Sequence, residues 1–175
     1  MDKQTLVAVE EYLGTSYEPD VDYVDGVLEE RDLGEFDHSD LQTEIALWLR
    51  NNYRPLGLNA FVELRTQVSA TRYRVPDVLV IQGNRPKRGL VTTPPLAVIE
   101  VLSPEDRLSR VRTKMNDFLR FGVRHCWLID PETRTASEYT LAGTHEVNDL
   151  VLRCSDPDFQ IPLLALFANI DSVTG

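Results

Sequence analysis

The sequence has only two cysteines and no apolar run long enough to cross a bilayer. Cys126 and Cys154 lie in apolar segments without paired spacing, which excludes a disulfide framework and a zinc-binding motif. A membrane helix needs roughly 20 apolar residues, and a secretion signal needs a basic region followed by an apolar one. Since neither pattern is present, we expect a cytoplasmic protein with reduced thiols and no membrane partner.

Several catalytic motifs are also absent. The chain has no glycine-rich phosphate loop, no GxSxG elbow and no cysteine-histidine set, and its histidines are not at metal-ligand spacing. These absences exclude P-loop nucleotide hydrolysis, serine chemistry and thiol chemistry.

What is present is an ordinary globular composition with an uneven charge distribution. The 175 residues are 42% apolar and 26% charged, which fits one domain over residues 1–175. The net charge of -10 argues against a nucleic-acid partner. However, residues 45–128 hold 14 basic and 6 acidic residues, whereas residues 1–44 hold 2 and 14. This asymmetry either reflects solvated surface or indicates a partner for the basic middle of the chain.

The hydrophobic pattern predicts an α+β or mixed α/β fold. Helices are predicted over residues 1–17, from Ser39 toward a break at Pro55-Leu56-Gly57, and over about 104–121, closed by Gly122. A hairpin is predicted over 23–30, with Asp25-Gly26 as its turn. Strands are predicted at 58–68, 74–82, 96–103, 125–130 and 135–141, followed by an apolar tail at 161–167. No repeat or linker divides the chain.

Two acids interrupt strands that are otherwise apolar. Asp77 shares its strand face with Val75 and Leu79, and Glu100 shares its face with Val98 and Leu102. A buried carboxylate costs several kcal/mol unless a cation or hydrogen-bond donors compensate it. Because the two strands are consecutive, we expect the two acids to lie close together, where they could bind one Mg²⁺.

A lysine interrupts the apolar stripe of the second long helix in the same way. Lys114 falls between Val111 and Phe118 on the stripe that packs against the sheet. It could therefore reach Asp77 and Glu100, which would give the set of groups that metal-dependent phosphodiester hydrolysis requires. The alternative is a buried ion pair that holds helix to sheet. We favour that alternative for each residue singly, but a metal site for the three together.

The series VPDVLVI, IEVLSPEDR, Lys114 and FGVRHCWLIDPETR resembles the Uma-two family of putative restriction endonucleases, in the PD-(D/E)XK nuclease superfamily. The resemblance extends from YVDG to IPLLALF. It implies a restriction-endonuclease-like mixed sheet flanked by helices, with Asp77 and Glu100 as Mg²⁺ ligands and Lys114 as the catalytic lysine. The superfamily pattern would place lysine two residues after Glu100, where this sequence has Leu102.

Further residues have a functional and a simpler interpretation. His38 matches a recurrent family histidine or simply caps a helix. Glu44 corresponds to an acid that helps to bind metal in many nucleases of the superfamily, or it faces solvent. Gln67 lines the cleft or belongs to a polar sheet edge. The loop between the two acidic strands supplies Arg85, Lys87 and Arg88 as candidates for contacts to DNA phosphates.

These observations lead to one main hypothesis and two alternatives. The main hypothesis is an endonuclease that uses Mg²⁺, or Mn²⁺ in its place, to hydrolyse DNA. The resemblance implies that it works as a homodimer. The first alternative is a catalytically weak or silent nucleic-acid-binding module of the same fold. The second is a structural oligomer in which the acids and the lysine form a salt bridge.

Overall fold

The computed structural model describes residues 5–31, 35–86 and 89–172. Its helices are α1 (Val9–Gly14), α2 (Phe36–Tyr53), the short 3-10 helix η1 (Arg54–Leu56), α3 (Leu108–Phe121) and α4 (Leu163–Asp171). Its first strands are β1 (Asp22–Val24), β2 (Val27–Glu29), β3 (Leu58–Val62), β4 (Arg65–Ser69), β5 (Arg72–Arg74), β6 (Val78–Gln82) and β7 (Leu90–Val91). The remaining strands are β8 (Ala97–Val101), β9 (His125–Asp130), β10 (Thr135–Thr140), β11 (Gly143–Glu146), β12 (Val151–Ser155) and β13 (Asp158–Pro162).

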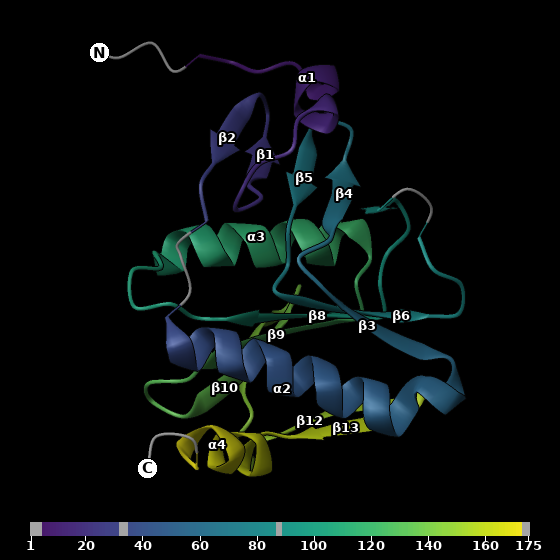
Figure 1. The fold of residues 1–175 in the computed structure, drawn as a ribbon, viewed down its shortest axis with the longest axis vertical. Helices are drawn as coiled ribbons and strands as arrows, with labels where there is room; N and C mark the ends of the chain where they lie inside the picture. The colour runs from purple at the N-terminus through teal and green to yellow at the C-terminus, as the bar shows by residue number, and fades with distance from the viewer. Residues whose placement is uncertain (1–4, 32–34, 87–88, 173–175) are drawn as a thin grey trace.

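The main sheet is mixed and is covered by a helix on each face. Within the described residues its strand order is β11-β10-β9-β8-β6-β3, with β8 and β9 parallel and the other neighbours antiparallel. In Figure 1, α3 lies on one side of this sheet and α2 on the other. The expected mixed sheet flanked by helices is therefore confirmed.

Side-chain alternation along the central strand divides the core between the two faces. Ile99 and Val101 of β8 pack with Ile45 of α2 in one hydrophobic cluster. Val98 points to the opposite face and joins the cluster that contains Phe118 of α3. Because side chains alternate along a strand, Glu100 faces α3 together with Val98.

A second sheet lies beyond α3 and includes the amino-terminal hairpin (Figure 1). Its strand order is β2-β1-β5-β4-β7. Asp25 and Gly26 have φ angles of 50° and 95°, as the predicted hairpin turn requires. Tyr12 of α1 packs with Tyr23 and Tyr73 in a separate aromatic cluster. The hairpin end of this sheet therefore has its own aromatic core, whereas Val68 of β4 and Val91 of β7 join the cluster that contains Phe118 of α3.

Two of the predicted strands are each divided between these two sheets. The segment 58–68 becomes β3 and β4, with a break at Glu63, whose φ is 53°. The segment 74–82 becomes the end of β5 and then β6, with Val75, Pro76 and Asp77 between them. The Glu63 N–H donates to the carbonyl oxygens of Pro76 and Asp77, at 3.2 and 3.3 Å. Asp77 therefore precedes β6 and does not lie within it.

The helix boundaries also differ from the sequence prediction. Helix α2 begins at Phe36, three residues before the predicted start, after an extended Glu35. Helix α3 begins at Leu108, because residues 104–105 form a turn, and it ends at Gly122 as predicted, where φ is 109°. The apolar tail at 161–167 forms the end of β13 and the start of α4. Over the described ranges, no helix is both long enough and apolar enough to span a membrane.

Candidate functional site

The three residues that the sequence singled out line one cavity. Asp77 lies between β5 and β6, Glu100 lies on the adjacent central strand β8, and Lys114 lies on the inner face of α3. All three are buried and line a cavity of about 60 Å³ between α3, the hairpin and β8. Leu102, two residues after Glu100, lines the same cavity, and Lys114 reaches the cavity from α3.

Lys114 and Glu100 form a buried ion pair. The Lys114 Nζ donates to Glu100 Oε2 at 2.9 Å and to the Val75 carbonyl oxygen at 2.8 Å. Burial raises the pKa of Glu100 to about 7, because the lowering effect of Lys114 does not fully offset the loss of solvent, and Asp77 raises it further. The other carboxylate oxygen, Glu100 Oε1, is buried and has no hydrogen-bond partner among the described residues.

Asp77 has partners on both of its oxygens. Arg31 donates to Oδ1 at 2.7 Å, while His38 Nε2, at 3.2 Å, and the Val101 N–H, at 2.8 Å, contact Oδ2. Burial favours the neutral acid, but the hydrogen bond from His38 and the positive charges of Lys114, His38 and Arg31 outweigh it and hold the pKa of Asp77 at about 2. The two acids of the site therefore differ. Both oxygens of Asp77 have partners, whereas Glu100 Oε1 has none among the described residues.

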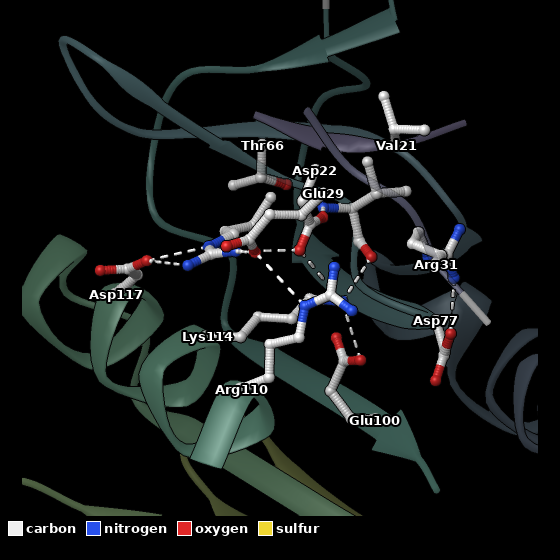
Figure 2. A network of polar contacts seen from close by, with 12 residues as sticks. Val21, Asp22, Glu29, Arg31, Thr66, Asp77, Glu100, Arg110, Lys114 and Asp117 are labelled. Carbon is white, nitrogen blue, oxygen red and sulfur yellow. Dashed lines mark hydrogen bonds and ion pairs between the residues drawn. The ribbon is translucent and has the colours of Figure 1, made fainter. Parts of the chain in front are cut away.

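Sequence reasoning missed several charged residues of this cavity, among them Asp22 and Arg31. Asp22 Oδ2 lies 4.0 Å from Lys114 Nζ, and Asp22 Oδ1 accepts the Val75 N–H at 2.7 Å. Figure 2 shows Asp22, Glu100 and Lys114 facing one another, with Arg31 and Asp77 beside them. Asp22 could have been noticed as an acid next to the apolar pattern of the hairpin, but no local signal singles out Arg31.

An arginine-centred network borders the cavity on its other side. The Arg74 guanidinium contacts Asp22, Glu29 and Asp117 at 2.7 to 3.1 Å, and its side chain is 1% exposed. Arg72 bridges Asp25 and Asp117. This network, part of which appears in Figure 2, ties the hairpin to α3 and so fixes one wall of the cavity.

The supporting residues predicted from sequence divide into two groups. His38 lies on the buried face of α2 and contacts Asp77, so the structure brings it into the site. Glu44 accepts a hydrogen bond from Asn169 of α4, and Gln67 lies half-buried on β4; neither is among the described residues that line the cavity. Arg85 is exposed and its guanidinium lies over the Phe61 ring. Lys87 and Arg88 lie outside the described residues.

The uneven charge distribution has a structural explanation. Acids of the first 44 residues form ion pairs with arginines of the middle segment: Asp20 with Arg65, Asp22 and Glu29 with Arg74, and Asp25 with Arg72. These pairs neutralise part of the basic middle inside the protein. The charge asymmetry is thus partly internal and is a weaker indication of a nucleic-acid partner than the sequence suggested.

The donor set of the cavity is compatible with one hard divalent cation. Among the described residues, no group of three or more His, Cys, Asp or Glu side chains is placed to hold a metal ion. Mg²⁺, however, often binds through one or two carboxylates and retains several waters. Glu100 Oε1 is a carboxylate oxygen that lacks a partner, and a buried polar atom of this kind needs an explanation. Asp77 and Glu100 are therefore the residues that would hold such an ion.

Comparisons with known proteins agree with this architecture. A crystal structure of a putative nuclease belonging to DUF820 from Anabaena variabilis superposes with a TM-score of 0.82, at 23% identity, over 94% of this chain and 99% of that one. A DrdV-DNA complex matches with a TM-score of 0.40 at 12% identity, over 78% of this chain and 13% of that one, which is too low to support an argument. Among curated proteins, no sequence matches. The model of the Uma2 family, described as putative restriction endonuclease, matches residues 9–164, and the chain therefore belongs to that family.

Proposed function

We propose that this protein is a metal-dependent endonuclease that hydrolyses DNA. The observation that carries the proposal is the meeting of Asp77, Glu100 and Lys114 in one cavity, with Glu100 Oε1 buried and without a partner among the described residues. These residues come from three separate elements, and two hydrophobic cores hold them in place. Membership of the Uma2 family supports the same interpretation.

The proposal gives a chemical role to Asp77, Glu100, Lys114 and His38. Asp77 and Glu100 would hold Mg²⁺, or Mn²⁺ in its place. The bound ion would polarise the phosphate and make an attacking water more acidic. Burial lowers the pKa of Lys114, but Asp22 and Glu100 outweigh it and raise that pKa, so the amine keeps its charge and can stabilise negative charge that develops on the phosphate. His38 orients Asp77 through their contact.

The substrate and the assembly belong to the same proposal. Arg85 is the described residue of the loop between the two acidic strands that we expect to contact DNA phosphates. We propose a homodimer, because two copies of such a site can cut both strands of a duplex. A silent nucleic-acid-binding module is the second candidate, and the pairing of both Asp77 oxygens is the observation that favours it.

Plasmid cleavage tests the proposal directly. The unaltered protein should cut supercoiled DNA with Mg²⁺ or Mn²⁺ and stop when a chelator removes the metal. Asp77→Asn should lower the cleavage rate by about a thousandfold or more, since it removes a metal ligand. Its free energy of unfolding should fall by no more than about 2 to 3 kcal/mol, because the pKa of Asp77 is lowered only from 3.8 to about 2 in the folded protein.

Asp149→Asn is the matched control. Asp149 is exposed and pairs with Arg153, away from the cavity, so its substitution should leave cleavage unchanged. A protein that retards DNA in a gel with a steep salt dependence, but leaves it uncut, would be the silent binding module. Equal cleavage by Asp77→Asn and by the unaltered protein would contradict the proposed site.

A further inference from the structure

We infer that Arg31 is an internal competitor of the metal: its guanidinium occupies the Asp77 oxygen that a divalent cation would take, and metal binding displaces it. This inference rests on the proposed function, because it concerns the same site. It assigns to Arg31 a positioning and gating role that neither the sequence pattern nor the family membership supplies. The contacts of the two carboxylates carry the argument.

The four carboxylate oxygens of the site are not equally accessible to a cation. Asp77 Oδ2 is held by the Val101 backbone N–H and by His38, which sits on a long helix. Asp77 Oδ1 accepts from Arg31 at 2.7 Å, and the described residues supply no other hydrogen bond to it. Glu100 Oε1 has no partner there at all. A cation that binds both acids most easily therefore takes Glu100 Oε1 and the oxygen now held by Arg31.

Arg31 is also the partner of Asp77 that can move. It follows β2 and lies in no helix or strand, and its long side chain is 13% exposed. Its Nη2 already lies 3.5 Å from Glu63 Oε1, and the Glu63 side chain is 46% exposed. The guanidinium thus has a second carboxylate beside it at the protein surface. Displacement from Asp77 would exchange one ion pair for another and would leave no buried charge alone.

Electrostatic repulsion favours this displacement. Asp77 and Glu100 already face the positive charges of Arg31, His38 and Lys114. Lys114 is fixed between Glu100 Oε2 and the Val75 carbonyl oxygen. A divalent ion beside both acids would be repelled by a guanidinium that stayed on Asp77, because like charges a few ångströms apart interact strongly in a partly buried site. The Arg31 contact therefore lowers metal affinity in the free protein.

Calorimetric titration of the full chain with Mn²⁺ alone, at fixed pH and ionic strength, tests the inference. Arg31→Gln removes the competing charge and should bind Mn²⁺ about tenfold more tightly than the unaltered protein. Arg31→Lys keeps the charge and should stay close to the unaltered affinity. Arg110→Gln is the matched control, since Arg110 lines the same cavity but contacts Glu29 and the Glu30 carbonyl, and it should change the affinity much less.

Glu63→Gln tests the second position of the guanidinium. It removes the carboxylate to which Arg31 would move, so Mn²⁺ should bind a few-fold more weakly. If Glu63 acts through Arg31, Glu63→Gln should hardly change the Mn²⁺ affinity of a protein that already carries Arg31→Gln. A double-mutant cycle measures this difference. A merely structural role for Arg31 would give the opposite result for Arg31→Gln, because a loosened site binds metal less tightly.

The outcomes separate this inference from the proposed function. If the unaltered protein binds Mn²⁺ and Asp77→Asn does not, but Arg31→Gln binds no more tightly, the metal site stands and the competition is refuted. If neither the unaltered protein nor Arg31→Gln binds Mn²⁺, the proposed function itself fails. Tighter binding by Arg31→Gln, with Arg31→Lys and Arg110→Gln near the unaltered value, would support the competition.

Discussion

Two buried polar clusters lie side by side in this protein, and they differ in how completely their charges are paired. In the Arg74 network, one guanidinium contacts Asp22, Glu29 and Asp117, and no buried side-chain oxygen of these described acids lacks a partner. In the site next to it, Glu100 Oε1 is buried without one. Both clusters touch α3, so the difference does not come from their position in the fold.

The contrast separates charges that hold the fold together from charges that are available for chemistry. A buried network is stable when every member is satisfied, and it then specifies a single arrangement of its elements. An unsatisfied oxygen raises the free energy of the folded state until a ligand binds it. We therefore expect substitutions in the first cluster to change stability, and substitutions in the second to change mainly activity and metal binding.

The largest stability effect is expected for Arg74→Met. The substitution keeps a long apolar side chain but leaves three carboxylates without their shared cation, so the free energy of unfolding should fall by about 3 kcal/mol or more. Chemical denaturation followed by circular dichroism measures this change.

Arg120→Met is the matched control for this substitution. Arg120 is an exposed arginine in the last turn of α3, so the same exchange of side chains should cost well under 1 kcal/mol there. Equal losses for the two variants would contradict a structural role for the network. A loss confined to Arg74→Met would sharpen the contrast between the two clusters.

A smaller effect, which depends on pH, is expected for Glu100→Gln. Burial raises the pKa of Glu100 to about 7 in the folded protein, so its ionisation opposes folding. The stability that the neutral Glu100 side chain contributes is fully present below the pKa that Glu100 has in the unfolded chain. This stability is lost as the pH rises through 7. Glutamine cannot ionise, so the Glu100→Gln variant does not lose this stability. The free energy of unfolding of the variant minus that of the unaltered protein should therefore increase by on the order of 2 kcal/mol between pH 5 and pH 8.

Asp149→Asn is the matched control for this pH series. The hydrogen bond from Arg153 lowers the pKa of Asp149, so this carboxyl is ionised in the folded and the unfolded chain throughout the range. The difference between Asp149→Asn and the unaltered protein should therefore stay constant from pH 5 to pH 8. A difference that is equally constant for Glu100→Gln would mean that Lys114 compensates the buried carboxylate fully.

The smallest effect is expected for Arg85→Gln, which lies in neither cluster. Arg85 is exposed, so its loss should weaken binding of a DNA duplex only a few-fold and should reduce the salt dependence by about one phosphate contact. Fluorescence anisotropy at several salt concentrations measures both quantities. Arg153→Gln, an exposed arginine paired with Asp149, serves as the control. An unchanged salt dependence for Arg85→Gln would remove this loop from the proposed DNA surface.

The fold could be predicted from sequence where one local rule decided the outcome. Gly122 marked the end of α3 because a left-handed cap favours glycine, and Asp25-Gly26 marked the hairpin turn. The breaks at Glu63 and Asp77 were missed, since the apolar pattern continues through both. Pro76 was the available signal for the second break, because proline cannot donate to a sheet ladder.

The site could be predicted in part for a similar reason. Glu100 and Lys114 stood out as polar residues in apolar patterns, and both line the cavity. Asp22 and Arg31 belong to a short hairpin and the segment after it, where charged residues usually face solvent. Their roles arise from contacts with β5, α3 and Asp77, more than 40 residues away along the chain, and a local pattern carries no information on such pairs.

The two crossings between sheets, at Glu63 and at Val75 to Asp77, place the site at the boundary between two halves of the molecule, the main sheet and the second sheet. Asp77 lies on backbone that belongs to neither half, Glu100 on the larger half and Asp22 on the smaller one. Because Val68 and Val91 of the smaller half pack in one cluster with Phe118 of α3, a substitution in this cluster would shift the hairpin half and change the width of the cavity. The geometry at the acids can thus be tuned from either side by substitutions that never touch them.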